Sequence, residues 1–128
     1  MENRKMVVDT GIFIEYLRAK DKIKTTLYSL PDEIEIAVSV ITLFELYIGA
    51  TTPEKWNDIK KLTDGIELIP LSPEISVEAA LIFLELKKGN HIIEFRDIFI
   101  AATARFMNIP IKTFNTKHFR RVKNIEVI

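Results

Sequence analysis

Short apolar runs alternate along the chain with longer stretches of helical spacing, and few folds accommodate that alternation. Runs rich in β-branched residues are predicted to form buried strands at 6–8, 34–38, 66–69 and 111–113, with a last strand at 125–127. Parallel strands need crossover connections of about a dozen residues or more, and the helical stretches supply them. We therefore expect an α/β fold, a three-layer α/β/α sandwich around a mostly parallel central sheet.

The stretches between these strands contain residues that typically begin and end helices. Ser39 is placed to cap a helix that Gly49 ends, and Pro53 and Pro73 lie in the first turns of two others. The expected helices run from residue 12 onward, over about 23–30, from 40 to 48, from 53 to about 64, from 73 to 88 and from 97 to 108.

Composition restricts the class of protein further. The 128 residues, 48% of them apolar and 28% charged, predict one globular domain over 1–128. The absence of cysteine excludes disulfides, thiolate zinc sites and a cysteine nucleophile. No apolar stretch approaches the roughly 18 residues of a membrane span, and no signal peptide opens the chain. We therefore expect a soluble, cytoplasmic protein with no membrane contact.

The charge of the chain is balanced in total but unevenly distributed. Eighteen basic and eighteen acidic residues cancel, yet the 28 residues between Asp97 and Glu126 contain no carboxylate and six basic side chains. An RNA phosphate backbone would be attracted to this C-terminal segment. The candidate phosphate contacts are Lys117, His118, Arg120 and Arg121, although a solvated surface explains the same residues.

Three carboxylates are candidates for chemistry. Asp9 follows the first strand, Glu45 lies in the helix after the second, and Asp97 opens a helix whose face continues through small residues. Each also has an ordinary explanation, a turn or helix cap for the aspartates and a solvated side chain for Glu45. Ligand crevices of parallel sheets lie beyond the carboxyl ends of the strands. If the acids converge there, their oxygens suit Mg²⁺ or Mn²⁺, and metal-assisted phosphodiester hydrolysis becomes possible.

Four segments of the chain together resemble the PIN-domain ribonucleases, and among these the VapC-type toxins of toxin–antitoxin pairs. The segments are VVDT at 7–10, VSVITLFELYIG at 38–49, DIFIAATA at 97–104 and TFNTKHF at 113–119. Their order and spacing are typical of the family, and the resemblance covers nearly the whole chain. It implies an endoribonuclease in which Asp9, Glu45 and Asp97 hold Mg²⁺ or Mn²⁺ and activate water, leaving 5′-phosphate and 3′-hydroxyl ends.

The resemblance also assigns supporting residues to the catalytic site. Asn115 lies where many family members carry a fourth acid, so the chain departs from the pattern there and the number of metal ions stays open. Glu94, three residues before Asp97, would compensate if the helix extends back to it. The polar positions that line the family's pocket are matched here by Thr10, Ser39 and Thr113, for which helix caps and turns are an equally good explanation.

The resemblance further implies protein partners. VapC-type toxins usually form homodimers, and a small antitoxin inhibits them through a tail that lies in an apolar groove over the N-terminal helices. Either such a groove or ordinary core packing explains the apolar side chains of these helices, which are Ile12, Phe13, Tyr16, Leu17, Leu27 and Tyr28.

Other functions fit parts of the sequence. The triplet 9–11 is also the signature of retroviral-type aspartic proteases, but those are glycine-rich all-β chains, whereas this chain has four glycines and a helical pattern directly after the triplet. A metal-free ribonuclease would use His91 and His118 as acid and base. A PIN-like module that binds RNA or protein without catalysis, and an RNA-processing nuclease outside a toxin pair, stay open as alternatives.

Overall fold

The computed structural model describes residues 4–128, and within this range four parallel strands form one sheet. The strands are β1 (Arg4–Val8), β2 (Ile34–Ser39), β3 (Glu67–Ile69) and β4 (Ile111–Lys112), in the spatial order β3-β2-β1-β4. Val7 of β1 is in register with Ala37 on one side and Ile111 on the other. The first two strands therefore occupy the centre of the sheet, where Val7, Val8, Ala37 and Val38 are fully buried.

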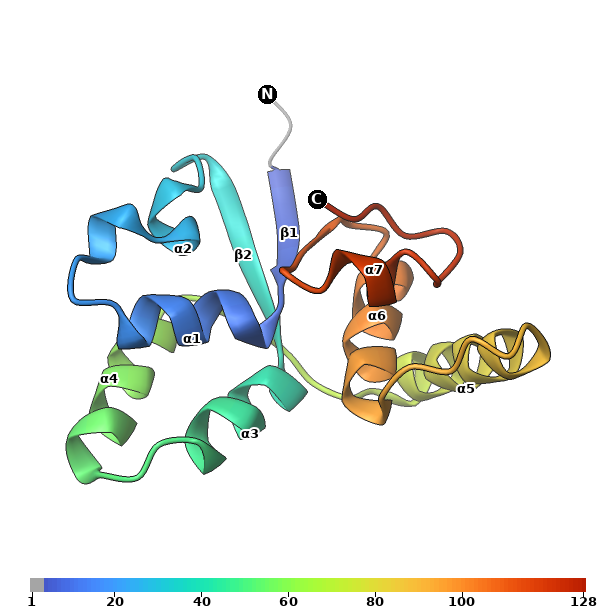
Figure 1. Cartoon of the computed structure of the whole chain (residues 1–128), viewed down its shortest axis with the longest axis horizontal. Helices are drawn as coiled ribbons and strands as arrows, with labels where there is room; N and C mark the ends of the chain where they lie inside the picture. Colours follow the sequence, from blue (N-terminus) through green and yellow to red (C-terminus); the bar gives the residue numbers. More distant parts are fainter. Residues whose placement is uncertain (1–3) are drawn as a thin grey trace.

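Helices pack on both faces of this sheet, which confirms the predicted three-layer arrangement (Figure 1). One face is covered by α1 (Thr10–Arg18), α2 (Thr26–Ser29), α3 (Val40–Ile48) and α4 (Pro53–Thr63). The other face is covered by α5 (Pro73–Lys88), α6 (Phe95–Met107) and the short α7 (Thr116–Phe119). Over residues 4–128, no helix is long and apolar enough to cross a bilayer.

Alternation of side chains along the central strands divides the core in two. Val7 of β1 packs toward α5 and α6, whereas its neighbours Met6 and Val8 pack toward α1, α3 and α4. On the α6 side, Ala101 and Ala104 are buried, as the sequence predicted for a helix face made of small residues. Both central strands are thereby fixed in register, which places their carboxyl ends together.

Two of the predicted helices, those expected over 23–30 and from 97, differ from the structure. The helix expected over 23–30 is divided into the 3₁₀ turn η1 (Lys22–Lys24) and α2. Thr25 causes the division, because its backbone is extended and its Oγ1 accepts a hydrogen bond from the Tyr28 N–H, which starts a new helix. The helix expected from 97 begins two residues earlier, so Asp97 lies inside the first turn of α6 instead of capping it.

The last predicted strand, at 125–127, is reduced to a single bridge between Ile111 and Val127. The partner strand β4 is only two residues long, because Thr113 leaves the sheet to enter the loop before α7. The segment 125–127 therefore finds no longer strand with which it could pair.

Candidate active site

The residues predicted to form the site lie at the carboxyl ends of three neighbouring strands. Asp9 directly follows β1, Ser39 ends β2 and Thr113 directly follows β4. All three are buried, and the Thr113 Oγ1 donates to Asp9 Oδ2 at 2.6 Å although 104 residues separate them in the chain. The parallel sheet thus brings together the first and last parts of the predicted site.

Asp9 is oriented by its own helix and by the neighbouring strand. It is the N-cap of α1, where its Oδ1 accepts a hydrogen bond from the Thr10 N–H at 2.8 Å while its Oδ2 accepts from Thr113. Burial raises the pKa of Asp9, and these two hydrogen bonds, which favour the ionised form, lower it only in part. The carboxylate is held in position but lacks a neutralising charge among these contacts.

Asp97 enters the same site from α6. Its Oδ2 accepts a hydrogen bond from Asn115 Nδ2 at 3.4 Å and lies 3.7 Å from His118 Nδ1. Asn115 Nδ2 also lies 2.7 Å from His118 Nδ1, so the side-chain amide contacts both the aspartate and the ring. Both α7-side residues predicted to belong to the site, Asn115 and His118, are therefore in contact with Asp97 or with each other.

The electrostatic environment of Asp97 is dominated by like charges. Burial is the main cause that raises the pKa of Asp97. The carboxylates that raise it further are those of Asp9, Glu94 and Glu45, while His118 acts in the opposite direction. Asp9 and Glu45 therefore lie close enough to Asp97 to repel its charge, and a cation beside Asp97 would relieve that repulsion.

Glu45 is positioned from α3 by a short chain of hydroxyl groups. Thr10 Oγ1 donates to Glu45 Oε1 at 2.8 Å, and the Thr42 hydroxyl lies 2.9 Å from the same Thr10 oxygen. Because a hydroxyl has only one proton to donate, Thr42 donates to Thr10 and Thr10 donates to Glu45. The other Glu45 oxygen, Oε2, lies 3.4 Å from Nη1 of Arg96.

Thr42 and Arg96 are site residues that the sequence reasoning missed. Thr42 lies three residues before Glu45 and so faces the same side of α3, and this spacing was an available signal. Arg96 is the direct neighbour of Asp97 in the chain, but its contact with Glu45 depends on how α3 packs against α6.

The donors of this site suit a hard divalent cation. They are carboxylate, amide and hydroxyl oxygens, the ligands that Mg²⁺ and Mn²⁺ prefer, and the mutual repulsion around Asp97 favours a positive charge. Among residues 4–128, however, no three His, Asp or Glu side chains already stand as a ligand cluster. Glu45 is paired with Arg96 in this structure, so Asp9 and Asp97 are the acids that would hold an ion directly.

The other residues predicted for the site lie further from Asp9 and Asp97 or act as helix caps. The Ser39 hydroxyl accepts a hydrogen bond from the Ile41 N–H at 3.1 Å and thus caps α3. Glu94 is the exposed N-cap residue of α6, and its carboxylate lies 3.8 Å from Arg96 Nη2. Arg121 Nη1 donates to the Ile92 carbonyl at 3.5 Å, whereas Lys117 and Arg120 are exposed around α7.

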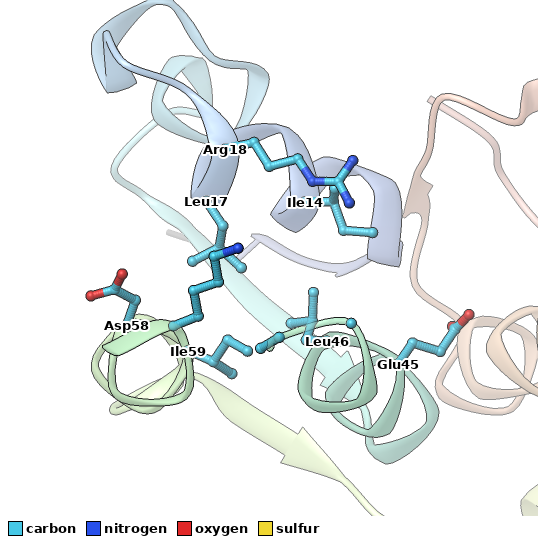
Figure 2. A pocket seen from close by; sticks show the side chains of 10 residues that line it. Ile14, Leu17, Arg18, Glu45, Leu46, Asp58 and Ile59 are labelled. Carbon is cyan, nitrogen blue, oxygen red and sulfur yellow. The ribbon is translucent and has the colours of Figure 1, made fainter. Parts of the chain in front are cut away.

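A groove of about 390 Å³ lies beside the acids, between α1, α3 and α4 (Figure 2). Its lining comprises Ile14, Leu17, Arg18, Glu45, Leu46, Gly49, Ala50, Lys55, Asp58 and Ile59. Glu45 is one of the three acids and also lines the groove, so the groove reaches the acids at one end. Of the residues predicted to form a groove here, Leu17 lines it, but Ile12 and Phe13 are fully buried core residues. For these two residues the structure supports the core-packing alternative, because their side chains pack in the core with Val8 and Val38.

Comparison with known proteins identifies the family. The model of the PIN domain matches residues 6–125. Ribonuclease VapC1 of Methanocaldococcus jannaschii is 32% identical over 122 residues, which cover 95% of this chain and 84% of that protein. Ribonuclease VapC of Rickettsia bellii is 35% identical over 130 residues, covering 96% and 94%.

Solved structures agree with these sequence relatives. VapBC-1 from nontypeable Haemophilus influenzae matches with a TM-score of 0.81 at 25% identity, over 97% of this chain and 96% of that chain. A toxin–antitoxin complex from Klebsiella pneumoniae matches with a TM-score of 0.77 at 24% identity, over 96% and 95%. Fold and site together define a parallel α/β protein with acids at the carboxyl ends of its strands. The chain belongs to the PIN-domain family, and its sequence relatives there are VapC ribonucleases.

Proposed function

We propose that this protein is a metal-dependent endoribonuclease that hydrolyses RNA phosphodiester bonds, and that it acts as the toxin of a toxin–antitoxin pair. The observation that carries the proposal is the meeting of Asp9 and Asp97 at the strand ends, where the charge of the first raises the pKa of the second. Two relatives at 32% and 35% identity bear the name ribonuclease, which supports RNA as the substrate.

The residues of this chain would act mainly by holding and orienting. Asp9 and Asp97 would bind Mg²⁺ or Mn²⁺, and Glu45 would complete the set of acids. When bound, such an ion lowers the pKa of a water molecule and offsets negative charge on the phosphoryl oxygens. Thr113 fixes the carboxylate of Asp9, and Thr10 fixes that of Glu45, through the hydrogen bonds already described.

Residues in and around α7 would act in two ways, some on Asp97 and others on the substrate. The Asn115 amide contacts Asp97 and the His118 ring together, and so limits the orientation of both. Lys117, Arg120 and Arg121 supply positive charge near these residues for the flanking phosphates of the RNA.

Cleavage of a labelled single-stranded RNA by the purified protein tests this function, with Mn²⁺, Mg²⁺ or EDTA present and with the product ends identified. We expect cleavage only with a divalent ion, leaving 5′-phosphate and 3′-hydroxyl ends, because an activated water attacks and the 2′-hydroxyl does not. Cleavage in EDTA with cyclic or 3′-phosphate ends would contradict it and favour the histidine mechanism. RNA binding without cleavage under any ion would favour the non-catalytic module.

The groove between α1, α3 and α4 is our proposed contact for an antitoxin. Its floor is formed by Leu17, Leu46 and Ile59, which point toward one another, and Glu45 lies at the end nearest α6 (Figure 2). An apolar segment that ends in a basic side chain would fill this floor and neutralise the acid. The Klebsiella pneumoniae neighbour was solved as a toxin–antitoxin complex, which supports a partner of this kind.

Ala50→Trp is expected to weaken binding of the antitoxin by at least about tenfold, because the indole would occupy the groove. The measurement is titration of the purified protein with the product of a small reading frame next to its gene. Thr51→Trp is the matched control, since Thr51 is the exposed next residue and does not line the groove. Equal affinities for the two variants would contradict the assignment of the groove.

A second surface supports the proposal of a homodimer. Phe95 stacks on Phe83 and Phe99 with ring centroids 6.5 Å and 6.2 Å away, yet 72% of Phe95 is exposed. These three rings, the phenylalanine patch, border an apolar hollow of about 260 Å³ between α5 and α6. A large ring held in order by its neighbours while facing solvent is typical of an interface with another copy.

We expect the wild-type protein to sediment as a dimer at micromolar concentration and Phe95→Ser to shift it toward the monomer, because the substitution removes the most exposed ring of the patch. Phe106→Ser is the control, since Phe106 is half exposed on the same helix but near its other end. A wild-type monomer, or an equal shift by both variants, would contradict the proposed interface.

A further inference from the structure

Arg96 contacts Glu45 on the α3 side of the site, and it is held there by weak contacts. Its Nη1 lies 3.4 Å from Glu45 Oε2 and its Nη2 lies 3.8 Å from Glu94 Oε2. Charge-assisted hydrogen bonds of arginine are typically about 2.7–2.9 Å long. Half of the Arg96 side chain is exposed, at 51%, so water competes for the same donors.

Arg105 lies nine residues after Arg96 in α6. It shows what an arginine with a structural role looks like in this protein. Its Nε donates to Glu78 at 2.6 Å and its Nη1 to Glu85 at 3.0 Å, and only 11% of the side chain is exposed. Arg105 thereby joins α6 to α5. Arg96 has neither the short distances nor the burial of this pair, so holding helices together does not explain it.

The position of Arg96 in its helix is also unfavourable for a purely structural role. It is the second residue of α6, and the first turn of a helix favours anions over cations because of the helix dipole. Its partner Glu45 is already satisfied at Oε1 by Thr10. Departure of the guanidinium leaves the hydrogen bond at Oε1 in place and frees only Oε2 of a carboxylate whose side chain is 20% exposed.

The negative charge of RNA is unfavourable beside the acids of this site, and the positive charge of Arg96 would offset it. The substrate is a polyanion, and the acids Asp9, Glu45 and Asp97 repel it. The basic residues of the C-terminal segment lie on the α7 side, where His118 contacts Asp97. Arg96 lies on the opposite, α3, side, where it contacts Glu45.

We propose that Arg96 is a substrate-contacting residue, whose guanidinium exchanges its weak pair with Glu45 for a phosphate of the RNA next to the bond that is cut. This inference rests on the proposed ribonuclease function and adds a residue to that site. The planar guanidinium binds two phosphate oxygens at once, which an ammonium group cannot do. Release of Glu45 from Arg96 at the same time would leave that carboxylate free to hold a divalent ion together with Asp9 and Asp97.

The test is binding of a fluorescein-labelled single-stranded RNA in EDTA, where metal-dependent cleavage is absent, by fluorescence anisotropy at several salt concentrations. For Arg96→Gln we expect affinity about five- to tenfold lower and a slope of log K against log salt smaller by about 0.7, the value for one lost phosphate contact on a single strand. Arg4→Gln is the matched control: Arg4 is exposed at the opposite end of β1, and the substitution removes the same charge.

Arg96→Lys separates charge from geometry. It should restore the salt slope, because the positive charge returns, yet cleave RNA at least about tenfold more slowly than the wild type in Mn²⁺, because one ammonium replaces a two-point contact. A thermal melt of each variant checks folding. If Arg96→Gln has the wild-type slope, or if Arg4→Gln changes the slope equally, the inference is overturned even where the wild type cuts RNA. A wild type that neither binds nor cuts RNA would instead overturn the proposed function.

Discussion

Asp97→Asn is expected to abolish RNA cleavage while leaving the protein folded and more stable. The substitution keeps the shape of the side chain but removes the charge that would hold a divalent ion together with Asp9. Loss of electrostatic stabilisation at a reacting phosphate costs about 10²–10³-fold in rate. The measurement is the single-turnover cleavage rate of a labelled RNA in saturating Mn²⁺, compared between the wild type and the variant.

Asp32→Asn is the matched control for this prediction. Asp32 is exposed in the loop before β2, at the opposite end of the sheet from the acids, so its removal should change the cleavage rate by less than about twofold. Cleavage by Asp97→Asn within tenfold of the wild type would contradict the role of Asp97, even if both proteins need metal.

The increase in stability follows from the raised pKa of Asp97. A carboxyl group whose pKa is higher in the folded state than the ordinary 3.8 disfavours folding wherever it is ionised. The penalty is absent below the unfolded pKa, grows as pH rises through the folded pKa, and is complete at neutral pH. Asp97→Asn removes it, so without metal the variant should be more stable at pH 7 by about 0.5–2 kcal/mol.

The pH dependence of that difference provides an independent check. As pH falls from the raised folded pKa toward the ordinary 3.8 of the unfolded chain, the difference in free energy of unfolding between the two proteins should shrink, and it should disappear below 3.8, where the carboxyl is neutral in both states. Saturating Mn²⁺ should reverse the order at neutral pH, because the ion stabilises the protein that binds it. A variant that is less stable than the wild type at pH 7 in EDTA would show that the repulsion at Asp97 is compensated elsewhere.

The sequence allowed the position of Asp9 to be predicted from a local signal, whereas Glu45 and Asp97 were assigned to the same site through the resemblance to the PIN-domain family. Asp9 stands at the end of a β-branched strand, and a parallel sheet sends every such end to the same edge. The burial of Ala101 and Ala104 was likewise predictable from the small residues of one helix face. These features depend on one strand or one helix each, so the pattern of a short segment is sufficient.

The features that could not be predicted depend on how separate elements pack. The contact of Arg96 with Glu45 requires α6 to lie beside α3, and the hydrogen bond from Thr42 to Thr10 requires α3 to lie beside α1. Apolar spacing also did not distinguish Phe13, which faces the sheet, from Leu17, which lines the groove one turn later. Both belong to the same helix, and only the tertiary packing decides which of them is covered.

Phe119→Ala is expected to cause the largest loss of stability among the substitutions considered, about 3–5 kcal/mol. Phe119 is completely buried and packs in the core with Ile111 and Val122. It belongs to α7, which has four residues and is too short to be stable alone. Asn115, the N-cap of α7, makes no side-chain capping bond, so the buried ring is the main anchor of this helix.

Phe114→Ala provides the comparison, because it removes the same ring five residues earlier where 55% of the residue is exposed, and should cost less than about 1 kcal/mol. Urea unfolding of both variants measures the difference, and Phe119→Leu, expected to cost about 1.5 kcal/mol, replaces Phe119→Ala if that protein does not fold. Equal losses at the two positions would contradict the anchoring role. Because α7 carries the Asn115 and His118 contacts to Asp97, a loosened α7 should also slow RNA cleavage at temperatures where the variant is still folded. The stability of the C-terminal core and the geometry of the acids thus depend on the same buried ring.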